Sequence, residues 1–300
     1  MSVRFRAMAA LVLPVALMGC GGCGCASTPS PHRVIETVAP GEVIVEGTLT
    51  ICSDLRRPPL EMVSGGVPAG TDILIGSDIA TRLGLKVEFK NTAKAEIPAS
   101  LSSSKCDIAL SALEMGAPDT AGLVMMPYGE LHQSLVVPIG NPDSIVGLTD
   151  LCGRMVGVIA GSDEEAGARG SGVYTGKDVF AVCRSAARPA PTVRSYATES
   201  DAEDALRSGL ADALFVDSAT GVYELEWYKD RVALIDNVTG NVAELGLAMS
   251  QGKQGLRAAV QKALDAMNAD GSMEDFWFRG GASDVQPGPF GSSPTSASRP

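Results

Sequence analysis

The sequence contains very little histidine, the residue most often used in acid–base catalysis. Its 300 residues include only 2 histidines, His32 and His132, and only His132 falls within the stretch whose pattern indicates a folded body. The sequence therefore offers no Ser-His-Asp or Cys-His arrangement and no spacing typical of a metal site. We expect no catalytic residue, no metal and no cofactor. An enzyme that uses two carboxylates as acid and base stays open as an alternative.

Positive charge is also in short supply. The chain has 24 lysines and arginines against 35 aspartates and glutamates, which gives a formal net charge of −11. A chain this acidic is poorly suited to the phosphate backbone of nucleic acids, so we expect no nucleic-acid partner. We attribute the excess of negative charge to solubility outside the cell.

Long apolar runs are missing except for one near the start. Residues 7–18 are mostly apolar, follow two arginines and are too short to span a bilayer comfortably, which is typical of a secretory signal. The run ends in Leu17-Met18-Gly19-Cys20, which resembles the lipobox of bacterial lipoproteins, whose cysteine becomes the lipidated first residue. We expect a signal peptide over 1–19 and a lipid on Cys20 as the only membrane attachment. A plain signal peptide or an uncleaved anchor is the alternative.

The rest of the chain divides by composition. Residues 20–45 predict a lipid-anchored linker, because Ser, Thr and Pro become frequent there, and the Gly/Ser/Pro-rich residues 281–300 predict a disordered tail. Between them, short apolar runs alternate with helical patterns. This alternation predicts an α/β fold with parallel sheets covered by helices.

One stretch of that body, Lys105 to Asp119, is expected to touch the ligand. Asp107 to Ser111 reads as a short buried strand, and a loop with Pro118 at an early helical position follows. Loops at the carboxyl ends of parallel strands line the ligand crevice of an open α/β sheet.

Helix signals recur further along the chain. Ser200-Asp201-Ala202-Glu203 has the form of a capping box and predicts a helix from there to Gly209. Asp217 ends a buried strand before a predicted helix over Ser218–Tyr228. The spacing of apolar residues predicts a last long helix that ends at Gly271.

Four cysteines, Cys52, Cys106, Cys152 and Cys183, lie in the folded body. An exported protein meets an oxidising environment, and four cysteines allow three connectivities. Cys52 would end one strand whereas Cys106 would begin a neighbouring parallel one, which places their Cα atoms roughly 10 Å or more apart, beyond the reach of a disulfide. We expect that pair not to form.

Several segments share their order and spacing with one protein family. They are Gly47–Asp54, Pro58–Glu61, Gly70–Asp72, Leu83–Phe89, Lys105–Asp107, Leu148–Gly153, Val156–Val158, Ala205–Gly209 and Ala269–Ser272. Together they resemble the extracellular solute-binding proteins of ABC importers, in the family that binds polar amino acids. The resemblance covers Gly47 to Arg279.

This resemblance implies a bilobal, type II periplasmic-binding-protein-like α/β fold. Two parallel-sheet lobes would be joined by two hinge strands, with lobe 1 over 46–138 and 243–280 and lobe 2 with the hinges over 139–242. The crossings would fall near Pro138–Asn141 and Val238–Asn241. Closure over a ligand would be the signal read by an ABC permease.

The resemblance also implies ligand contacts. Asp217 occupies the place of the acidic residue that meets the ligand's amino group, and Gly157–Ser162 matches the loop that meets its carboxylate. The chain departs from the family where a Thr and a carboxylate-binding Arg are usual, because it has Gly116 and Asp119 there. Arg56 or Arg57 is a candidate for the missing cation; otherwise an amine-bearing or neutral polar solute fits better.

The full set of residues expected at the ligand is Asp54, Arg56, Leu60, Ser111, Leu113, Gly116, Asp119, Tyr128, Ser162 and Asp217. Leu60 stands where the family has an aromatic wall. Two simpler interpretations stay open: Asp217 as a helix cap alone, and Tyr128 as a packing residue. The family has a branch with a Leu-Cys-Gly pattern and a later cysteine, which implies a disulfide between Cys152 and Cys183.

The function that follows is a lipid-anchored extracellular binding protein that delivers a small polar solute, an amino acid or amine, to an ABC permease. A sensor or scaffold that keeps the fold without binding is one alternative. An enzyme is the other, because dehydratases acting on cyclic acids use the same fold.

Overall fold

The computed structural model describes residues 33–170, 179–239 and 242–282, without the side chain of Asp119. The expected signal peptide, Cys20 and residues 283–300 of the expected tail lie outside the described residues. None of the described helices combines the length and the apolar character that crossing a bilayer requires.

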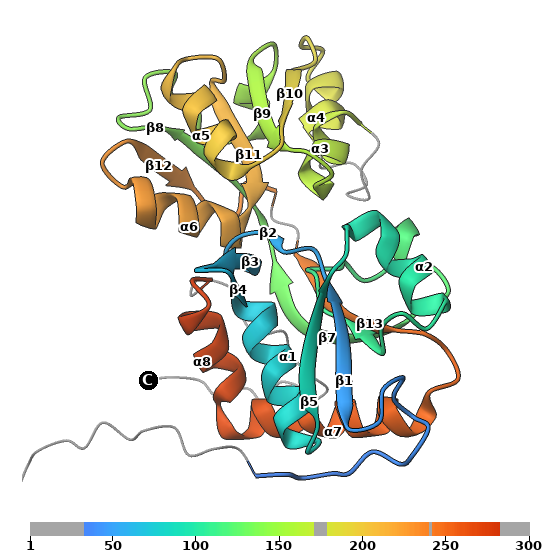
Figure 1. Ribbon diagram of the computed structural model, residues 1–300. Helices are drawn as coiled ribbons and strands as arrows, with labels where there is room; N and C mark the ends of the chain where they lie inside the picture. The colour runs from blue at the N-terminus through green and yellow to red at the C-terminus, as the bar shows by residue number, and fades with distance from the viewer. Residues whose placement is uncertain (1–32, 171–178, 240–241, 283–300) are drawn as a thin grey trace, which may run out of the picture. The chain divides into compact units, whose positions relative to one another are not determined.

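The first lobe is built on a five-stranded sheet of order β5-β1-β6-β13-β7 (Figure 1). β1 pairs in parallel with β5 and β6, whereas β13 is antiparallel to β6 and β7. The strands are β1 (Thr48–Ser53), β5 (Lys86–Asn91), β6 (Ile108–Ala109), β7 (Val124–Leu131) and β13 (Ala243–Met249). A small antiparallel sheet of β2 (Arg56–Arg57), β3 (Glu61–Ser64) and β4 (Val67–Ala69) lies at the end of the first lobe that faces the second (Figure 1).

Helices cover this sheet. They are α1 (Thr71–Arg82), α2 (Ile97–Ser102), α7 (Gln254–Asp270) and α8 (Ser272–Arg279), with 3₁₀ turns η1 (Lys94–Glu96) and η2 (Pro118–Thr120). α7 ends where the sequence predicts, at Gly271, whose φ of 80° is readily available only to glycine. Pro118 does not start an α-helix, because η2 is a single turn.

The second lobe has a sheet of order β10-β9-β11-β8-β12. β9 pairs in parallel with β10 and β11, and β8 is antiparallel to β11 and β12. Its strands are β8 (Gln133–Pro138), β9 (Met155–Ile159), β10 (Thr192–Tyr196), β11 (Ala213–Asp217) and β12 (Val232–Ile235). Its helices are η3 (Leu148–Leu151), α3 (Asp163–Ala168), α4 (Val179–Ser185), α5 (Glu199–Arg207) and α6 (Ser218–Tyr228).

Burial explains why these strands form. β1 is buried except at its first residue, and β11 is buried throughout, as expected for short apolar runs covered on both faces. The predicted bilobal α/β fold is confirmed, although each five-stranded sheet mixes parallel and antiparallel pairs. The helix over Ser218–Tyr228 has the predicted bounds. α5 begins earlier than predicted, because Thr198 caps it by accepting a hydrogen bond from the Asp201 N–H.

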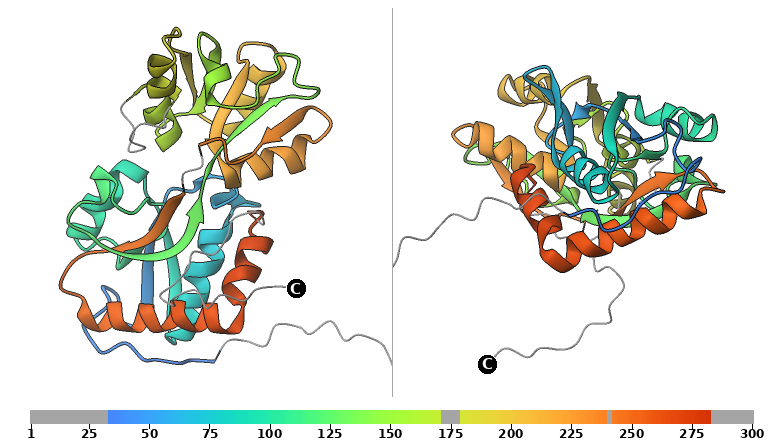
Figure 2. Two further views of the ribbon diagram at one scale, coloured as in Figure 1. Left: turned by 180° about the vertical axis from the view of Figure 1, so that it is seen from behind. Right: turned by 60° about the horizontal axis from the view of Figure 1, so that its bottom comes forward.

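The chain crosses between the lobes along two neighbouring paths, which are seen from behind in Figure 2. β7 belongs to the first sheet and β8 to the second, so the first crossing falls at His132 and not at Pro138–Asn141. The reason is that β7 and β8 follow one another almost without a break, while Pro138–Asn141 forms the turn at the far end of β8. The second crossing lies between β12 and β13, where Val238–Asn241 was expected; residues 240 and 241 lie outside the described residues.

Both pairs of body cysteines form disulfides. The Cys152–Cys183 bond was expected from the family resemblance and is present. The expectation that Cys52 and Cys106 stay apart was wrong, because they are bonded with Cα atoms 5.7 Å apart. The strand-rise estimate fails since Cys106 precedes β6: it is Ala109 that pairs in register with Cys52, and Cys106 packs beside Cys52 with Ile97 and Leu101 of α2.

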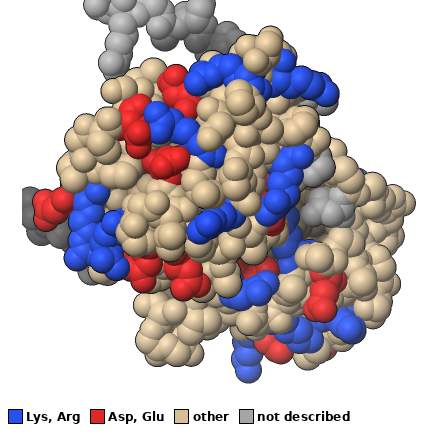
Figure 3. All heavy atoms as spheres, turned by 90° about the horizontal axis from the view of Figure 1, so that it is seen from above, with Lys and Arg blue, Asp and Glu red and all other residues tan. Residues whose placement is uncertain are grey.

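Charge is interspersed on the face seen from above in Figure 3. Basic side chains occur there in several separate groups, some of them beside acidic side chains, with uncharged surface between the groups. This face therefore offers no extended basic surface of the kind that binds a phosphate backbone.

Candidate functional site

A cavity of about 450 Å³ lies between the two lobes. The first lobe contributes the loop after β1, β2 and the start of η1, and the second contributes the turn from β9 into α3. The lining residues are Asp54, Arg56, Arg57, Ala93, Lys94, Ala95, Ile159, Ala160, Gly161, Ser162, Asp163 and Ala197. Because its walls come from both lobes, its size depends on how the lobes close.

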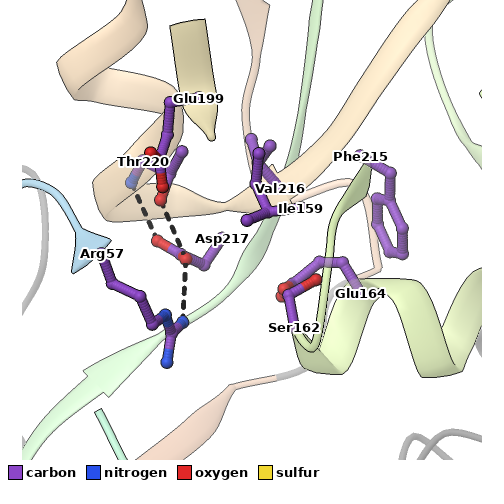
Figure 4. Close-up of a pocket in the computed structure, with 9 residues that line it drawn as sticks. All are labelled: Arg57, Ile159, Ser162, Glu164, Glu199, Phe215, Val216, Asp217 and Thr220. Atoms are coloured by element: carbon purple, nitrogen blue, oxygen red, sulfur yellow. Dashed lines mark hydrogen bonds and ion pairs between the residues drawn. The ribbon is translucent and has the colours of Figure 1, made fainter. Parts of the chain in front are cut away.

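A smaller, deeper cavity of about 10 Å³, enough for one water molecule, adjoins this space. Arg57, Ile159 and Ser162 are common to both linings. The other lining residues of the deeper cavity are Glu164, Glu199, Phe215, Val216, Asp217 and Thr220 (Figure 4). Three carboxyl groups thus lie around a single arginine.

Asp217 is placed by the end of β11, directly before α6. Its Oδ1 accepts a hydrogen bond from the Thr220 N–H at 2.8 Å and its Oδ2 accepts one from the Thr220 hydroxyl at 3.0 Å, so it caps α6. The same Oδ2 lies 3.4 Å from Nη2 of Arg57, which comes from the first lobe (Figure 4). Asp217 is therefore a helix cap and also a wall of the deeper cavity.

Arg57 enters this site from β2, with 16% of its side chain exposed. Its Nη1 is buried and finds no hydrogen-bond partner among the described residues. Burial lowers the pKa of Arg57, but Glu61, Asp217, Asp163 and Glu164 outweigh this effect and raise the pKa. The guanidinium thus stays charged and keeps an unused donor group.

The two glutamates of the deeper cavity, Glu164 and Glu199, have higher pKa values than surface glutamates. Burial, followed by the nearby charges of Asp217, Asp163 and Glu114, raises the pKa of Glu164 to about 8. Burial likewise raises the pKa of Glu199 to about 7. Near neutral pH, Glu164 is therefore mostly protonated and Glu199 is half ionised.

Lys94 links the lobes on the other side of the large cavity. Its Nζ lies 2.7 Å from Oδ2 of Asp163, and its backbone N–H donates to Oδ2 of Asp54 at 3.0 Å. Burial acts to raise the pKa of Asp163, but Lys94 and Arg57 outweigh it and lower the pKa. Asp54 in turn accepts two hydrogen bonds from Arg56, each of 2.7 Å.

The loop expected to receive the ligand carboxylate, Gly157–Ser162, already forms hydrogen bonds with Glu165. The Gly161 N–H donates to Oε2 of Glu165 at 2.8 Å, and the Ser162 hydroxyl accepts a hydrogen bond from the Glu165 N–H at 3.1 Å. Ser162 thus caps α3, and Glu165 reaches back to the residue before the cap, which differs from a capping box by one residue. A carboxylate of the protein itself therefore uses the first donor of this loop.

A buried polar network supports the site from the first lobe. The Ser111 hydroxyl donates to Glu61 at 3.1 Å and accepts from the Asp54 N–H at 2.9 Å. The Tyr128 hydroxyl donates to Asp72 at 2.9 Å, and Asp72 also hydrogen-bonds Glu61. Burial and the charge of Asp72 raise the pKa of Glu61 well above its usual range, so Glu61 holds a proton that the two carboxyl groups share.

The structure gathers some of the sequence-predicted residues at the cavities. Asp54, Arg56, Ser162 and Asp217 line one cavity or both. The others lie elsewhere: Leu60, Leu113 and Tyr128 are buried in the first lobe, Ser111 lies beneath Asp54, and Gly116 is exposed with φ of 80°. The side chain of Asp119 lies outside the described residues.

Tyr128 illustrates a packing role. Its ring is fully buried and stacks on Trp277 with ring centroids 6.1 Å apart, while its hydroxyl is bound by Asp72. Leu60 is likewise 2% exposed and belongs to the apolar core of the first lobe. Neither side chain lines the two cavities.

Several lining residues were absent from the predicted set, namely Arg57, Lys94, Asp163, Glu164 and Glu199. In sequence, Arg57 was only one of two candidates for the missing cation, because the family's arginine is absent and a charged pair precedes the double proline. No signal in the sequence pointed to Lys94 or Glu199, since each looks like an ordinary surface residue. Among the described residues, no group of three or more His, Cys, Asp and Glu side chains could hold a metal ion.

The family model of the bacterial extracellular solute-binding proteins, family 3, matches residues 49–278. The chain belongs to this family. This family 3 protein is 26% identical over 240 residues to the L-cystine-binding protein TcyJ of Escherichia coli (strain K12), which covers 77% of this chain and 83% of the relative.

Solved structures agree with this assignment. An ancestral arginine-binding protein bound to arginine matches with a TM-score of 0.65 and 28% identity, covering 78% of this chain and 97% of that one. The ancestral amino acid-binding protein AncCDT-1, a precursor of cyclohexadienyl dehydratase, matches with a TM-score of 0.65 and 25% identity, covering 78% and 95%. The predicted family is confirmed, and the fold is that of the bilobal amino-acid-binding proteins.

Proposed function

We propose that this protein is the lipid-anchored, extracellular solute-binding component of an ABC importer, and that it captures a polar amino acid or a related amine-bearing solute between its lobes. The observation that carries the proposal is the position of Asp217. Its carboxylate ends β11, lies in the wall of the deeper cavity and faces Arg57 of the opposite lobe.

The charges around Asp217 favour a ligand that carries an ammonium group. Glu164 and Glu199 lie in the same cavity, and both can become negative as a cation approaches. A buried carboxylate without a full set of cationic partners attracts a positive group strongly, because the low local dielectric weakens screening. The relatives point the same way, since they are named for binding cystine, arginine or amino acids.

Direct binding tests the proposal. Purified protein is titrated by isothermal calorimetry with L-cystine, L-arginine, L-glutamine and putrescine, and each mixture is checked by mass spectrometry for product. Saturable binding of at least one compound without turnover is expected. Turnover would favour an enzyme that uses Glu164 as a general acid. Binding of none of the four compounds would favour a scaffold without a ligand.

The membrane attachment is a separate part of the proposal and rests on the sequence Leu17–Cys20. Replacement Cys20→Ala should move the protein from the membrane fraction to the soluble fraction of a bacterial host. The wild-type protein should carry a lipid mass on Cys20, and an unmodified thiol at that position would contradict the anchor.

A further inference from the structure

We infer that Arg57 binds the carboxylate of the ligand, so that the site selects α-amino acids over the corresponding amines. This inference rests on the proposed function and narrows its ligand class. The acid group of such a ligand needs a partner, and Gly116, which stands in the place of a family Thr, carries no side chain to supply one.

The loop before α3 does not replace that partner. The Gly161 N–H donates to Glu165, and the Ser162 hydroxyl caps the helix by accepting from the Glu165 N–H. A ligand carboxylate that used the Gly161 N–H would have to displace the carboxylate of Glu165, which is tied to α3 and further held by Arg169. The acid group therefore needs a cation from elsewhere in the site.

Two arginines of β2 are available, and they differ in exposure and in hydrogen bonding. Arg56 has 66% of its side chain exposed and uses Nε and Nη2 in a two-pronged contact with Asp54. Arg57 is 16% exposed, lines both cavities and has a buried Nη1 that meets no hydrogen-bond partner in the described part of the chain. An unpaired buried donor is costly unless a water molecule or a ligand meets it.

The backbone fixes Arg57 in this position. β2 pairs with β3 so that Arg57 lies opposite Glu61, and β3 continues into the hairpin with β4. Burial acts to lower the pKa of Arg57, but nearby carboxyl groups, Glu61 and Asp217 first among them, outweigh it, so the guanidinium stays charged. The donor is thus preorganised, which reduces the entropy lost on binding.

The pairing with Asp217 matches the chemistry of an α-amino acid. Nη2 of Arg57 lies 3.4 Å from Oδ2 of Asp217, which is a long contact, so a cation and an anion stand side by side at the deeper cavity. An α-amino acid carries its ammonium and carboxylate on one carbon, and the two groups can meet Asp217 and Arg57 together. A planar guanidinium suits a carboxylate because it presents parallel N–H donors.

The test compares each amino acid with its decarboxylated analogue. Calorimetric dissociation constants are measured for L-arginine against agmatine and for L-cystine against cystamine, using the wild type, Arg57→Gln and Arg57→Lys. The wild type should bind at least one amino acid about 10- to 100-fold more tightly than its amine, the range expected for a charge-assisted contact. Arg57→Gln should abolish that ratio by weakening the amino acid alone, and Arg57→Lys should keep part of it.

Arg207→Gln is the control, because Arg207 is exposed and pairs with Asp204 on α5 away from both cavities. Its dissociation constants should equal those of the wild type, and thermal unfolding should show that all variants are folded. The inference is overturned if Arg57→Gln leaves the ratio between the amine and amino-acid dissociation constants unchanged, or if it tightens the binding of both compounds. It is also overturned if Arg56→Gln, measured in the same way, abolishes the ratio instead. Failure of the proposed function differs, because the wild type would then bind no compound of either pair.

Discussion

Lys94 of the first lobe and Asp163 of the second form an ion pair with 2.7 Å between Nζ and Oδ2. Only 13% of the Lys94 side chain and 20% of the Asp163 side chain are exposed. Asp163 also hydrogen-bonds Glu114 of the first lobe. The contact between the lobes is therefore polar, and it lies beside the cavity that a ligand would fill.

Replacement Lys94→Gln should weaken ligand affinity without removing a ligand contact on the second lobe. The ion pair favours the closed arrangement, and losing a partly buried pair should lower the closed population and raise the dissociation constant by about fivefold. Calorimetry measures the affinity and small-angle scattering measures closure. Arg279→Gln, which breaks an exposed pair with Asp275, is the control, and an equal effect in both variants would contradict a role for Lys94 in closure.

Asp217 has two roles that two substitutions can separate. Asn caps helices about as well as Asp, so Asp217→Asn should keep α6 intact while removing the charge. Its melting temperature should change little, whereas its affinity for an ammonium-bearing ligand should fall about 10- to 100-fold. Asp217→Ala should lose the cap as well, which costs about 1 kcal/mol of unfolding free energy. Unchanged affinity in Asp217→Asn would leave Asp217 as a cap alone.

Glu224 should make the stability of the protein depend on pH. Burial, followed by the charges of Glu199 and Glu203, raises its pKa from 4.5 to about 8, and its side chain has a buried oxygen without a partner among the described residues. In the unfolded chain Glu224 ionises near pH 4.5, whereas in the folded chain it holds its proton up to about pH 8. Its contribution to the free energy of unfolding is therefore fully present below about pH 4.5 and is lost as the pH rises through about 8.

Replacement Glu224→Gln tests this pH dependence, because glutamine cannot ionise. Glu164 and Glu199 act in the same direction, so the quantity of interest is the difference between variant and wild type, measured by urea unfolding at several pH values. The free energy of unfolding of Glu224→Gln, relative to that of the wild type, should rise by roughly 1–3 kcal/mol between about pH 5 and pH 9. A difference that is constant over this range would show that Glu224 titrates normally.

The Cys52–Cys106 bond should stabilise the first lobe. It joins residues 54 apart in the sequence, and the entropy of closing a loop of that length in the unfolded chain corresponds to about 4 kcal/mol. The double variant Cys52→Ser, Cys106→Ser should lose an amount of this order in urea unfolding. The matched variant of Cys152 and Cys183, which encloses 31 residues, should lose slightly less. Alkylation of Cys52 or Cys106 in the unreduced protein would contradict the bond.

The sequence predicted the central strands of this fold well, because strands such as β1 and β11 are buried and therefore form distinct apolar runs. The helix over Ser218–Tyr228 and the end of α7 at Gly271 follow from caps that act within a few residues. The crossing at His132 was missed because no residue there interrupts the strand, and only pairing with a second sheet divides β7 from β8.

The candidate site shows the same division between local and distant information. Asp217 could be found because it follows a buried strand and precedes a helix, and both features are local. Arg57 could only be offered as one of two neighbouring arginines, since its choice over Arg56 depends on which side chain the second lobe meets. Lys94 and Asp163 are 69 residues apart, and nothing in either segment indicates the other.

By itself, then, the sequence determined the α/β character and the placement of an acidic residue at the end of β11, because these depend on short-range patterns of burial and capping. It also indicated the family, through the order and spacing of segments that resemble it. The tertiary structure decided that Cys52 reaches Cys106, that Tyr128 packs on Trp277, and that Arg57 faces Asp217 across the lobes. Each of these depends on how distant segments turn and pack in space, which the spacing of residues along the chain does not encode.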